Sequence, residues 1–293
     1  TNMQPVDPHD PLLRQVLPVG EELLDRSGFS SDPVGDEAAV KAPGLLHKYN
    51  GRALLVVTGA CPVHCRYCFR RHFPYSDGPR NVRELAPALA AIASDESIEE
   101  VILSGGDPLT VNDEQLGELA RRIANISHVR RLRIHTRMPV MIPQRVTGEL
   151  LDWLTGTRLT PVVVVHANHP QEIDEAIGAS FRGLADAGAM VLNQSVLLAG
   201  VNDNAEVLAE LSKRLIQCGV LPYYLHQLDR VSGAAHFEVA EATGRDIVKQ
   251  MQAGLPGYLV PRYVREVAGN PGKMILLYEP RHARAERSRR FES

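Results

Sequence analysis

The stretch EVILSGGDPLTVNDEQLGELARRIANISHVRRLRIH, residues 100–135, decides the fold. Residues 100–103 and 131–135 have strand patterns, and between them apolar residues recur at helical spacing over 113–123. Asn112, with Gln115 three residues later, is typical of a helix start. The stretch therefore predicts a strand, a helix and a second strand that runs parallel to the first.

The same alternation continues along the chain and predicts strands at 53–58, 100–103, 131–135, 161–166, 190–196 and 221–225. This pattern favours an α/β fold, either an open doubly wound sheet or a partial barrel. In both architectures, functional side chains lie at the carboxyl ends of the strands. We therefore expect polar clusters at that end of the sheet, namely 104–107, 135–137, 166–169 and 193–195.

Three parts of the chain differ in composition. Residues 1–51 are rich in proline and are expected to form an irregular extension that wraps the domain. Residues 52–280 carry the strand and helix patterns and form the expected barrel domain. Residues 281–293 carry five arginines and form a basic tail, which is most simply a solvated segment.

Composition and charge exclude several classes of protein. The 293 residues are 44% hydrophobic and 23% charged, which is typical of a globular protein. The net charge of −3 provides no global positive field, so no nucleic-acid partner is expected. The longest aliphatic run, 162–165, is far too short to cross a membrane, and no signal-peptide pattern is present. With four cysteines, too few for a disulfide framework, we expect a cytoplasmic protein.

Cys61, Cys65 and Cys68 follow the first predicted strand in the loop CPVHCRYC. Three thiolates this close in sequence can converge on one soft metal centre. Structural zinc usually needs a fourth ligand. Cys218 is distant in the sequence, and His64 is next to Cys65, where simultaneous ligation is awkward. A 4Fe–4S cluster held by three cysteines leaves one iron open for a small molecule, so we favour the cluster over zinc.

This cysteine spacing, with an aromatic residue before the last cysteine, resembles the signature of radical S-adenosylmethionine (SAM) enzymes. The resemblance implies that the three cysteines hold a 4Fe–4S cluster and that SAM, bound to the open iron, yields a 5′-deoxyadenosyl radical. The stretch SGGD at 104–107 is similar to the family's second SAM-binding element, where glycines allow close approach and an acid accepts from an ammonium. The residues implied to bind SAM are Tyr67, Ser104, Gly105, Gly106, Asp107, His166 and Gln194.

A narrower resemblance rests on seven stretches: PGLLHKY at 43–49, CFRR at 68–71, SGGDPL at 104–109, PQR at 143–145, NHP at 168–170, NQSVLL at 193–198 and PYY at 222–224. In this order they resemble lysine 2,3-aminomutase. The resemblance implies a partial (β/α)6 barrel of the radical SAM type and a second cofactor, pyridoxal 5′-phosphate (PLP). The segment GNPGK at 269–273 is similar to the one whose lysine anchors PLP, which makes Lys273 the implied catalytic lysine.

The resemblance also implies how the substrate is held. Arg70 matches an arginine that grips the substrate carboxylate, and Asp229 and Glu266 match two acids that receive the distant ammonium of lysine. The remaining residues implied to contact PLP are Lys48, Tyr49, Arg52 and His226. Two positions depart from the family pattern, because Glu266 replaces an aspartate and His226 a tyrosine. We expect lysine rather than glutamate, since two acids repel a side-chain carboxylate.

Within the family, CFRRHFPY at 68–75, YLHQLD at 224–229 and GAAHF at 233–237 resemble the branch that makes (R)-β-lysine for the lysylation of elongation factor P. The resemblance implies functional links to elongation factor P and its lysyl ligase, and an electron donor such as flavodoxin or ferredoxin. The alternatives are a free lysine or glutamate 2,3-aminomutase of amino-acid metabolism and, from another class, a zinc-stabilised binding protein.

Overall fold

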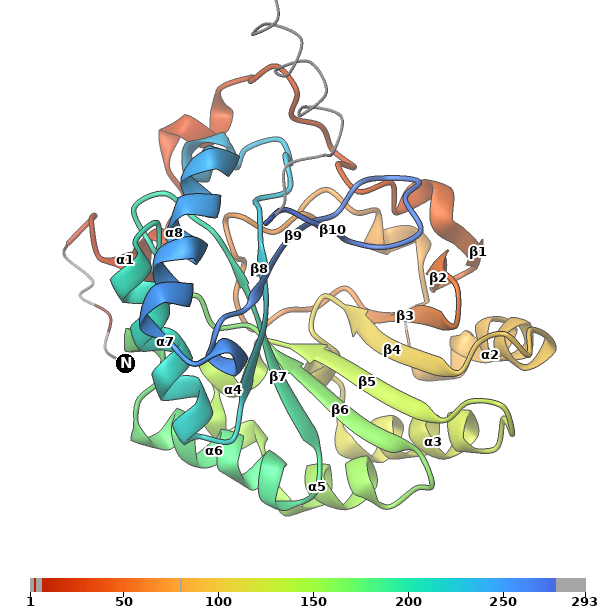
Figure 1. The fold of residues 1–293 in the computed structure, drawn as a ribbon. Helices are drawn as coiled ribbons and strands as arrows, with labels where there is room; N and C mark the ends of the chain where they lie inside the picture. Colours follow the sequence, from red (N-terminus) through yellow and green to blue (C-terminus); the bar gives the residue numbers. More distant parts are fainter. Residues whose placement is uncertain (1–2, 4–6, 80, 278–293) are drawn as a thin grey trace, which may run out of the picture.

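A computed structural model of the chain describes residue 3, residues 7–79 and residues 81–277. The described residues contain a ten-stranded sheet whose strands follow one another in chain order from β1 to β10 (Figure 1). The strands are β1 (Val40–Ala42), β2 (Leu45–Tyr49), β3 (Arg52–Thr58), β4 (Glu100–Gly105), β5 (Arg131–Thr136), β6 (Thr160–Val165), β7 (Met190–Val196), β8 (Leu221–His226), β9 (Arg262–Arg265) and β10 (Met274–Ile275). The expected basic tail, 281–293, lies outside the described residues.

The sheet is parallel from β3 to β9 and antiparallel at both edges. The six predicted strands are confirmed as β3 to β8, with ends that differ by no more than two residues from those predicted. A seventh parallel strand, β9, and the edge strands β1, β2 and β10 are not predicted by the sequence pattern. The irregular extension therefore needs a correction, because residues 40–49 form strands that pair with the sheet.

The longer helices cover the outer face of the curved sheet and leave its concave side, called the lumen below, to the strands (Figure 1). The α-helices of the described residues are α1 (Pro11–Arg14), α2 (Ala86–Ser94), α3 (Asp113–Ala124), α4 (Met138–Met141), α5 (Gly148–Thr155), α6 (Glu175–Asp186), α7 (Ala205–Gln217) and α8 (Glu241–Gly254). Short 3₁₀ helices connect them: η1 (Gly20–Leu23), η2 (Glu37–Ala39), η3 (Tyr75–Asp77), η4 (Val82–Leu85), η5 (Pro108–Thr110), η6 (Pro143–Arg145), η7 (Pro170–Glu172), η8 (Ala235–Phe237) and η9 (Gly257–Leu259). None of the helices in the described part is both long and apolar enough to span a bilayer.

Helix α3 forms where the sequence predicts it. The Asn112 side chain accepts a hydrogen bond from the Gln115 backbone N–H at 2.9 Å and so satisfies one of the free donors of the first turn. Leu116, Leu119 and Ile123 are fully buried against the sheet. The amphipathic pattern thus gives the helix its packing face.

Alternation along the strands separates the core from the lumen. On β5, Leu132 and Ile134 join the core between sheet and helices, so Arg133 and His135 point to the opposite side, into the lumen. On β6 and β7 a small apolar cluster containing Val164 and Leu192 faces the lumen as well. The lumen is therefore partly apolar, and its polar side chains gather towards the carboxyl ends of the strands, as the sequence predicts.

Candidate active site

The cysteine loop leaves β3 and packs closely against the end of β4. The Gly106 N–H donates to the Thr58 carbonyl at 2.8 Å, and the Asp107 N–H donates to the Ala60 carbonyl at 2.7 Å. A Cβ atom on Gly105 would lie 2.3 Å from the Thr58 oxygen, and one on Gly106 2.2 Å from the Ala60 oxygen. Both glycines are therefore required for the close approach that sets the cysteine loop beside the strand.

Asp107 joins the ends of β4 and β5. One carboxylate oxygen accepts from Leu109 N–H and from the Thr136 hydroxyl, and the other accepts from the backbone N–H groups of Arg137 and Met138, all at 2.7–3.0 Å. Burial raises the pKa of Asp107 and these hydrogen bonds oppose that rise. Both oxygens are thus engaged by the protein, and the carboxylate organises the loops around the predicted SAM site.

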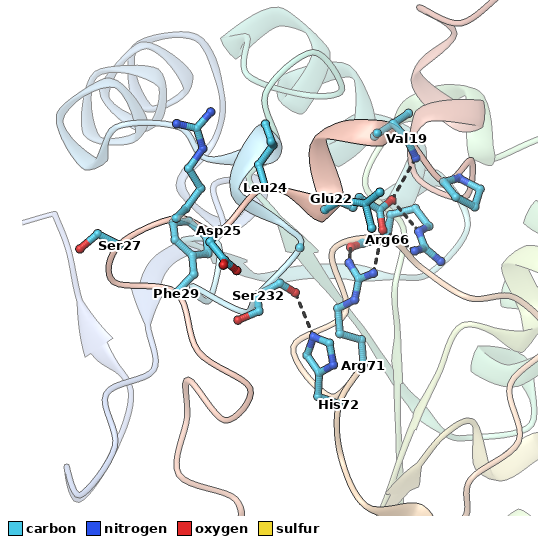
Figure 2. A pocket seen from close by; sticks show the side chains of 15 residues that line it. Val19, Glu22, Leu24, Asp25, Ser27, Phe29, Arg66, Arg71, His72 and Ser232 are labelled. Atoms are coloured by element: carbon cyan, nitrogen blue, oxygen red, sulfur yellow. Dashed lines mark hydrogen bonds and ion pairs between the residues drawn. The ribbon is translucent and has the colours of Figure 1, made fainter.

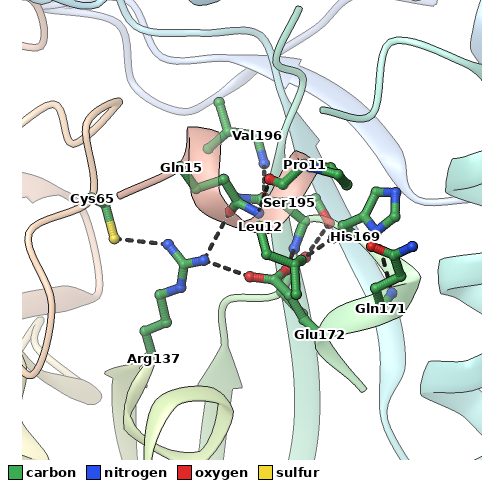
Figure 3. Close-up of polar contacts among 12 residues, drawn as sticks. Pro11, Leu12, Gln15, Cys65, Arg137, His169, Gln171, Glu172, Ser195 and Val196 are labelled. Carbon is green, nitrogen blue, oxygen red and sulfur yellow. Dashed lines mark hydrogen bonds and ion pairs between the residues drawn. The ribbon is translucent and has the colours of Figure 1, made fainter. Parts of the chain in front are cut away.

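Arg137 connects the cysteine loop to the N-terminal extension and to the chain after β6 (Figure 3). Its guanidinium donates to Cys65 Sγ at 2.8 Å and to Gln15 Oε1 at 2.8 Å, and it pairs with Glu172. It also donates to the Tyr67 hydroxyl. The sequence predicts a polar cluster at 135–137 but no role for Arg137, Gln15 or Glu172. The guanidinium thus places a positive charge beside the Cys65 sulfur.

Tyr67 lies inside this network. Its hydroxyl accepts from Asn168 Nδ2 at 2.7 Å, and its ring meets the ring of Phe237 edge to face at 6.2 Å. Asn168 also donates to Gln15, which is fully buried. Tyr67, one of the residues implied to bind SAM, is therefore held by Arg137, by the chain after β6 and by η8.

Three histidines, of which His226 is buried and His135 and His166 are half-buried, line the lumen at the carboxyl ends of β5, β6 and β8. His135 and His166 lie with ring centroids 5.6 Å apart, and His226 ends β8. Burial lowers the pKa of all three, that of His166 to about 4, so the rings are neutral near pH 7. The Nε2 atoms of His135 and His226 are buried without a hydrogen-bond partner. Unpartnered polar atoms of this kind indicate that the lumen is built to receive a polar ligand.

The predicted substrate and PLP residues meet in a second polar cluster of the lumen. Glu266, just after β9, pairs with Lys273 and with Lys48 at 3.3 Å, and burial would raise its pKa, but the two lysines hold it at about 2. Burial and the nearby Glu266 raise the pKa of Asp229 to about 7. Glu266 also lies close to Tyr49, whose pKa is raised by burial first and by that carboxylate second.

Of the other predicted residues, Arg70 and Ser104 lie in contact with each other, and Arg52 lies at the opposite end of β3 from the cysteine loop. The buried Arg70 donates from Nη1 to Ser104 Oγ at 3.0 Å, so a predicted substrate residue contacts a predicted SAM residue. Gln194 is buried on β7. Arg52 opens β3, at the end of that strand away from the cysteine loop, and lies over the Tyr49 ring at 4.5 Å from its centroid. The structure thus brings the predicted residues to one lumen, with Arg52 at its far end.

A pocket of about 820 Å³ lies outside this lumen, between the N-terminal extension and the cysteine loop. Figure 2 shows Glu22 on its wall, between Arg66 and Arg71, with which it forms ion pairs. Burial would raise the pKa of Glu22, but the two arginines lower it to about 2. The predicted site residues do not line this pocket, whereas Lys48, Tyr49 and Glu266 line a smaller one of about 200 Å³.

The donor set fits the expected cofactors. Within 7–79 and 81–277, no three Cys, His, Asp or Glu side chains are arranged around a single-ion site. A 4Fe–4S cluster instead takes one thiolate for each iron, and Cys61, Cys65 and Cys68 supply three. Burial and the neighbouring Cys65 raise the pKa of Cys68, so the thiol keeps its proton until a cation displaces it. The unpartnered imidazoles and the lysine at 273 fit a polar cofactor in the lumen.

Comparisons with known proteins agree with this arrangement. Residues 55–173 match the Radical SAM superfamily. The chain is 49% identical over 269 residues to an L-lysine 2,3-aminomutase of Haemophilus influenzae, covering 92% of this chain and 80% of that protein. It is 47% identical to an L-lysine 2,3-aminomutase of Escherichia coli, with coverages of 94% and 80%.

Among solved structures, native anSMEcpe with bound AdoMet and Kp18Cys peptide is similar at a TM-score of 0.50 and 11% identity. That similarity covers 68% of this chain and 57% of the other, and it concerns the fold alone. The partial barrel expected from the sequence is thus confirmed. Because two relatives exceed 45% identity over most of both chains, this protein belongs to the lysine 2,3-aminomutase family of radical SAM isomerases, whose cofactors are a 4Fe–4S cluster, SAM and PLP.

Proposed function

We propose that the protein is a lysine 2,3-aminomutase that converts (S)-α-lysine into (R)-β-lysine. The observation that carries the proposal is the distribution of charge in the lumen. Arg70 supplies a buried guanidinium for a carboxylate, and Asp229 and Glu266 supply carboxylates for an ammonium. An amino acid with a positively charged side chain matches both ends of this arrangement. The names of the relatives support the same substrate.

Cys61, Cys65 and Cys68 would hold the cluster, and Lys273 would hold PLP. When bound, the cluster and SAM supply a hydrogen-abstracting radical, and PLP supplies the conjugated system that lets the amino group migrate. Lys273 is poised for attachment because its Nζ lies in the lumen, paired with Glu266. With Lys273 attached to PLP, Oε2 of Glu266 would lose its partner and Oε1 would stay paired with Lys48, so one carboxylate oxygen would be open to the ammonium of the substrate.

The residues proposed around PLP divide by charge. Lys48 and Arg52 are cations and Tyr49 is a protonated phenol, a combination that suits a phosphate dianion. His226 is neutral and buried, and its unpartnered Nε2 is available for a hydrogen bond to the ring of the cofactor. This imidazole would take the position that a tyrosine holds in other lysine aminomutases.

The residues proposed around SAM lie at the ends of β4, β6 and β7. Gly105 and Gly106 present bare backbone beside the cysteine loop, with Ser104 next to them. Tyr67 would border the adenine, and His166 and Gln194 would border the rest of SAM from the far side of the lumen. Asp107 is assigned to this site as well. Its hydrogen bonds to the Thr136 hydroxyl and the Arg137 backbone N–H hold the surrounding loops in place.

Substrate selection follows from the acids. Glutamate would bring its side-chain carboxylate towards Asp229 and Glu266, and a like-charge contact in a partly buried site is costly. The lysine ammonium instead gains two acceptors. Glu266 is one methylene longer than the aspartate of the family pattern, so its carboxylate reaches further into the lumen.

The proposed physiological role is to supply (R)-β-lysine to the lysyl ligase that modifies elongation factor P. A small electron-transfer protein such as flavodoxin or ferredoxin would reduce the cluster. The proposed compartment is the cytoplasm, where free thiols persist. We also propose the division into an extension at 1–51, a barrel at 52–280 and a basic tail at 281–293.

The decisive experiment is anaerobic reconstitution with iron, sulfide and PLP, followed by addition of SAM, a reductant and either lysine or glutamate. Mass spectrometry should detect β-lysine from lysine and no β-glutamate from glutamate. A preparation with intact cluster and PLP that leaves lysine unchanged would refute the substrate assignment. For the physiological role, β-lysine supplied to a deletion strain should restore the modification of elongation factor P, and a failure of rescue would favour a free aminomutase.

Metal analysis of the same preparation tests the alternative from another class. Iron and sulfide in about equal amounts are expected. Zinc without iron or sulfide would instead favour a zinc-stabilised binding protein.

A further inference from the structure

Asp36 lies between two cations of the site. It is in the N-terminal extension just before η2, and its side chain is only 3% exposed. Its Oδ2 lies 2.6 Å from Arg70 Nε, and its Oδ1 lies 2.5 Å from Lys48 Nζ. The backbone N–H of Asp36 is itself held by Asp32 Oδ1 at 2.9 Å. A buried carboxylate in a fixed loop therefore bridges the proposed substrate residue and the proposed phosphate residue.

The contacts of Arg70 leave one edge of its guanidinium available. Nε donates to Asp36, and Nη1 donates to Ser104 Oγ at 3.0 Å. The Phe69 ring lies 4.9 Å from the guanidinium carbon and restricts its rotation. The other N–H donors of Arg70, on Nη1 and Nη2, have no partner among the described residues. These donors form the end of the planar fork, which matches a carboxylate with two parallel hydrogen bonds.

Within the described ranges, Lys48 has three partners. Its Nζ pairs with Asp36 and with Glu266, and it donates to the Val34 carbonyl at 2.8 Å. Without Asp36, Lys48 and Arg70 would face each other as two cations in a partly buried site, and either one would attract a substrate carboxylate. The Asp36 carboxylate lowers this repulsion and leaves Arg70, rather than Lys48, to bind the substrate carboxylate.

From this geometry we propose that Asp36 is a positioning residue for substrate recognition. It holds Arg70 by Nε so that the Nη1–Nη2 edge faces the α-carboxylate of the substrate, and it keeps Lys48 from competing for that carboxylate. This inference rests on the proposed aminomutase function and adds the determinant of carboxylate recognition. Asp36 contacts neither substrate nor cofactor in this role and acts through Arg70 and Lys48.

The test uses the reconstituted holoenzyme without reductant and follows the visible absorbance of PLP during titration with lysine or with lysinamide, which lacks the carboxylate. The wild type should bind lysine more tightly than lysinamide. Asp36→Asn should weaken lysine binding by about tenfold and leave lysinamide binding nearly unchanged. Glu37→Gln, at the exposed neighbouring residue, is the matched control and should behave as the wild type.

Equal weakening for both ligands, or no weakening, would overturn the proposal, because damage to the fold affects both ligands alike. If Asp36→Asn fails to fold, Asp36→Glu takes its place in the test. The glutamate keeps the charge but displaces the Arg70 guanidinium by about the length of one methylene, so the preference for lysine over lysinamide should also fall. An unchanged preference in that variant contradicts the inference. A wild type whose spectrum does not respond to lysine would refute the proposed function itself, which separates the two failures.

Discussion

Replacement of Gly106 by alanine tests the contact that sets the cysteine loop against β4. The added Cβ would lie 2.2 Å from the Ala60 oxygen and 2.8 Å from the Gly59 carbonyl carbon. Real Cβ contacts are not shorter than about 3 Å, so the backbone must move apart by about 1 Å. That movement breaks two short hydrogen bonds, from Gly106 to Thr58 and from Asp107 to Ala60. Lost hydrogen bonds and overpacking together should lower the free energy of unfolding by about 3 kcal/mol.

The assay is urea unfolding of anaerobically purified protein followed by circular dichroism, with iron measured on the same samples. The matched control is Gly183→Ala in α6, where a Cβ meets no atom within 4 Å. This control should be neutral or gain up to about 1 kcal/mol from helix propensity. Gly106→Ala should also lose much of its iron, because the loop that carries the cysteines is displaced. If Gly106→Ala matches the control in stability and iron content, the reasoning from close approach is wrong.

Three further predictions concern the chemistry of the site. Because the pKa of Asp229 is raised to about 7, it is mostly protonated at pH 6 and ionised at pH 8, so lysine affinity should rise about tenfold over that range. Titrations of PLP absorbance should show this rise in the wild type, and a rise of equal size in Asp229→Asn would contradict it. Arg137→Met removes the hydrogen bond and the positive charge beside Cys65, so the reduction potential of the cluster, measured by EPR-monitored titration, should become more negative. Arg137→Lys keeps the charge and should shift less; equal shifts would argue against the electrostatic cause. Lys273→Ala should abolish the visible absorbance of lysine-bound PLP, and persistence of that band would place the anchor at another lysine.

Some of the parallel strands could be predicted because they are compact hydrophobic runs. Residues 161–165 and 53–57 are almost entirely apolar and β-branched or aliphatic, which is typical of strands covered on both faces. β9 escaped prediction because Arg262–Arg265 has only four residues and begins and ends with an arginine. The edge strands β1 and β10 have only three and two residues, too few to establish a period.

The site was predictable where residue type alone restricts the chemistry. Three cysteines at close spacing carry such a restriction by themselves, whereas the double glycine after a strand and the lysine at 273 became candidates only through the family resemblance. Gln15 and Asp36 carry none, since both lie in irregular chain and are common surface residue types. Only the folded structure, in which the extension packs against Arg137 and Arg70, shows that the two side chains are buried.

The folded-back extension also has a consequence for protein engineering. Gln15 and Asp36 are the acceptors of two arginines that belong to the barrel, and a buried arginine deprived of its acceptor is strongly destabilising. A chimera that joins the leading segment of one family member to the barrel of another should therefore preserve these two pairings. We expect such chimeras to fold when the N-terminal extension keeps acceptors that pair with both arginines of the barrel.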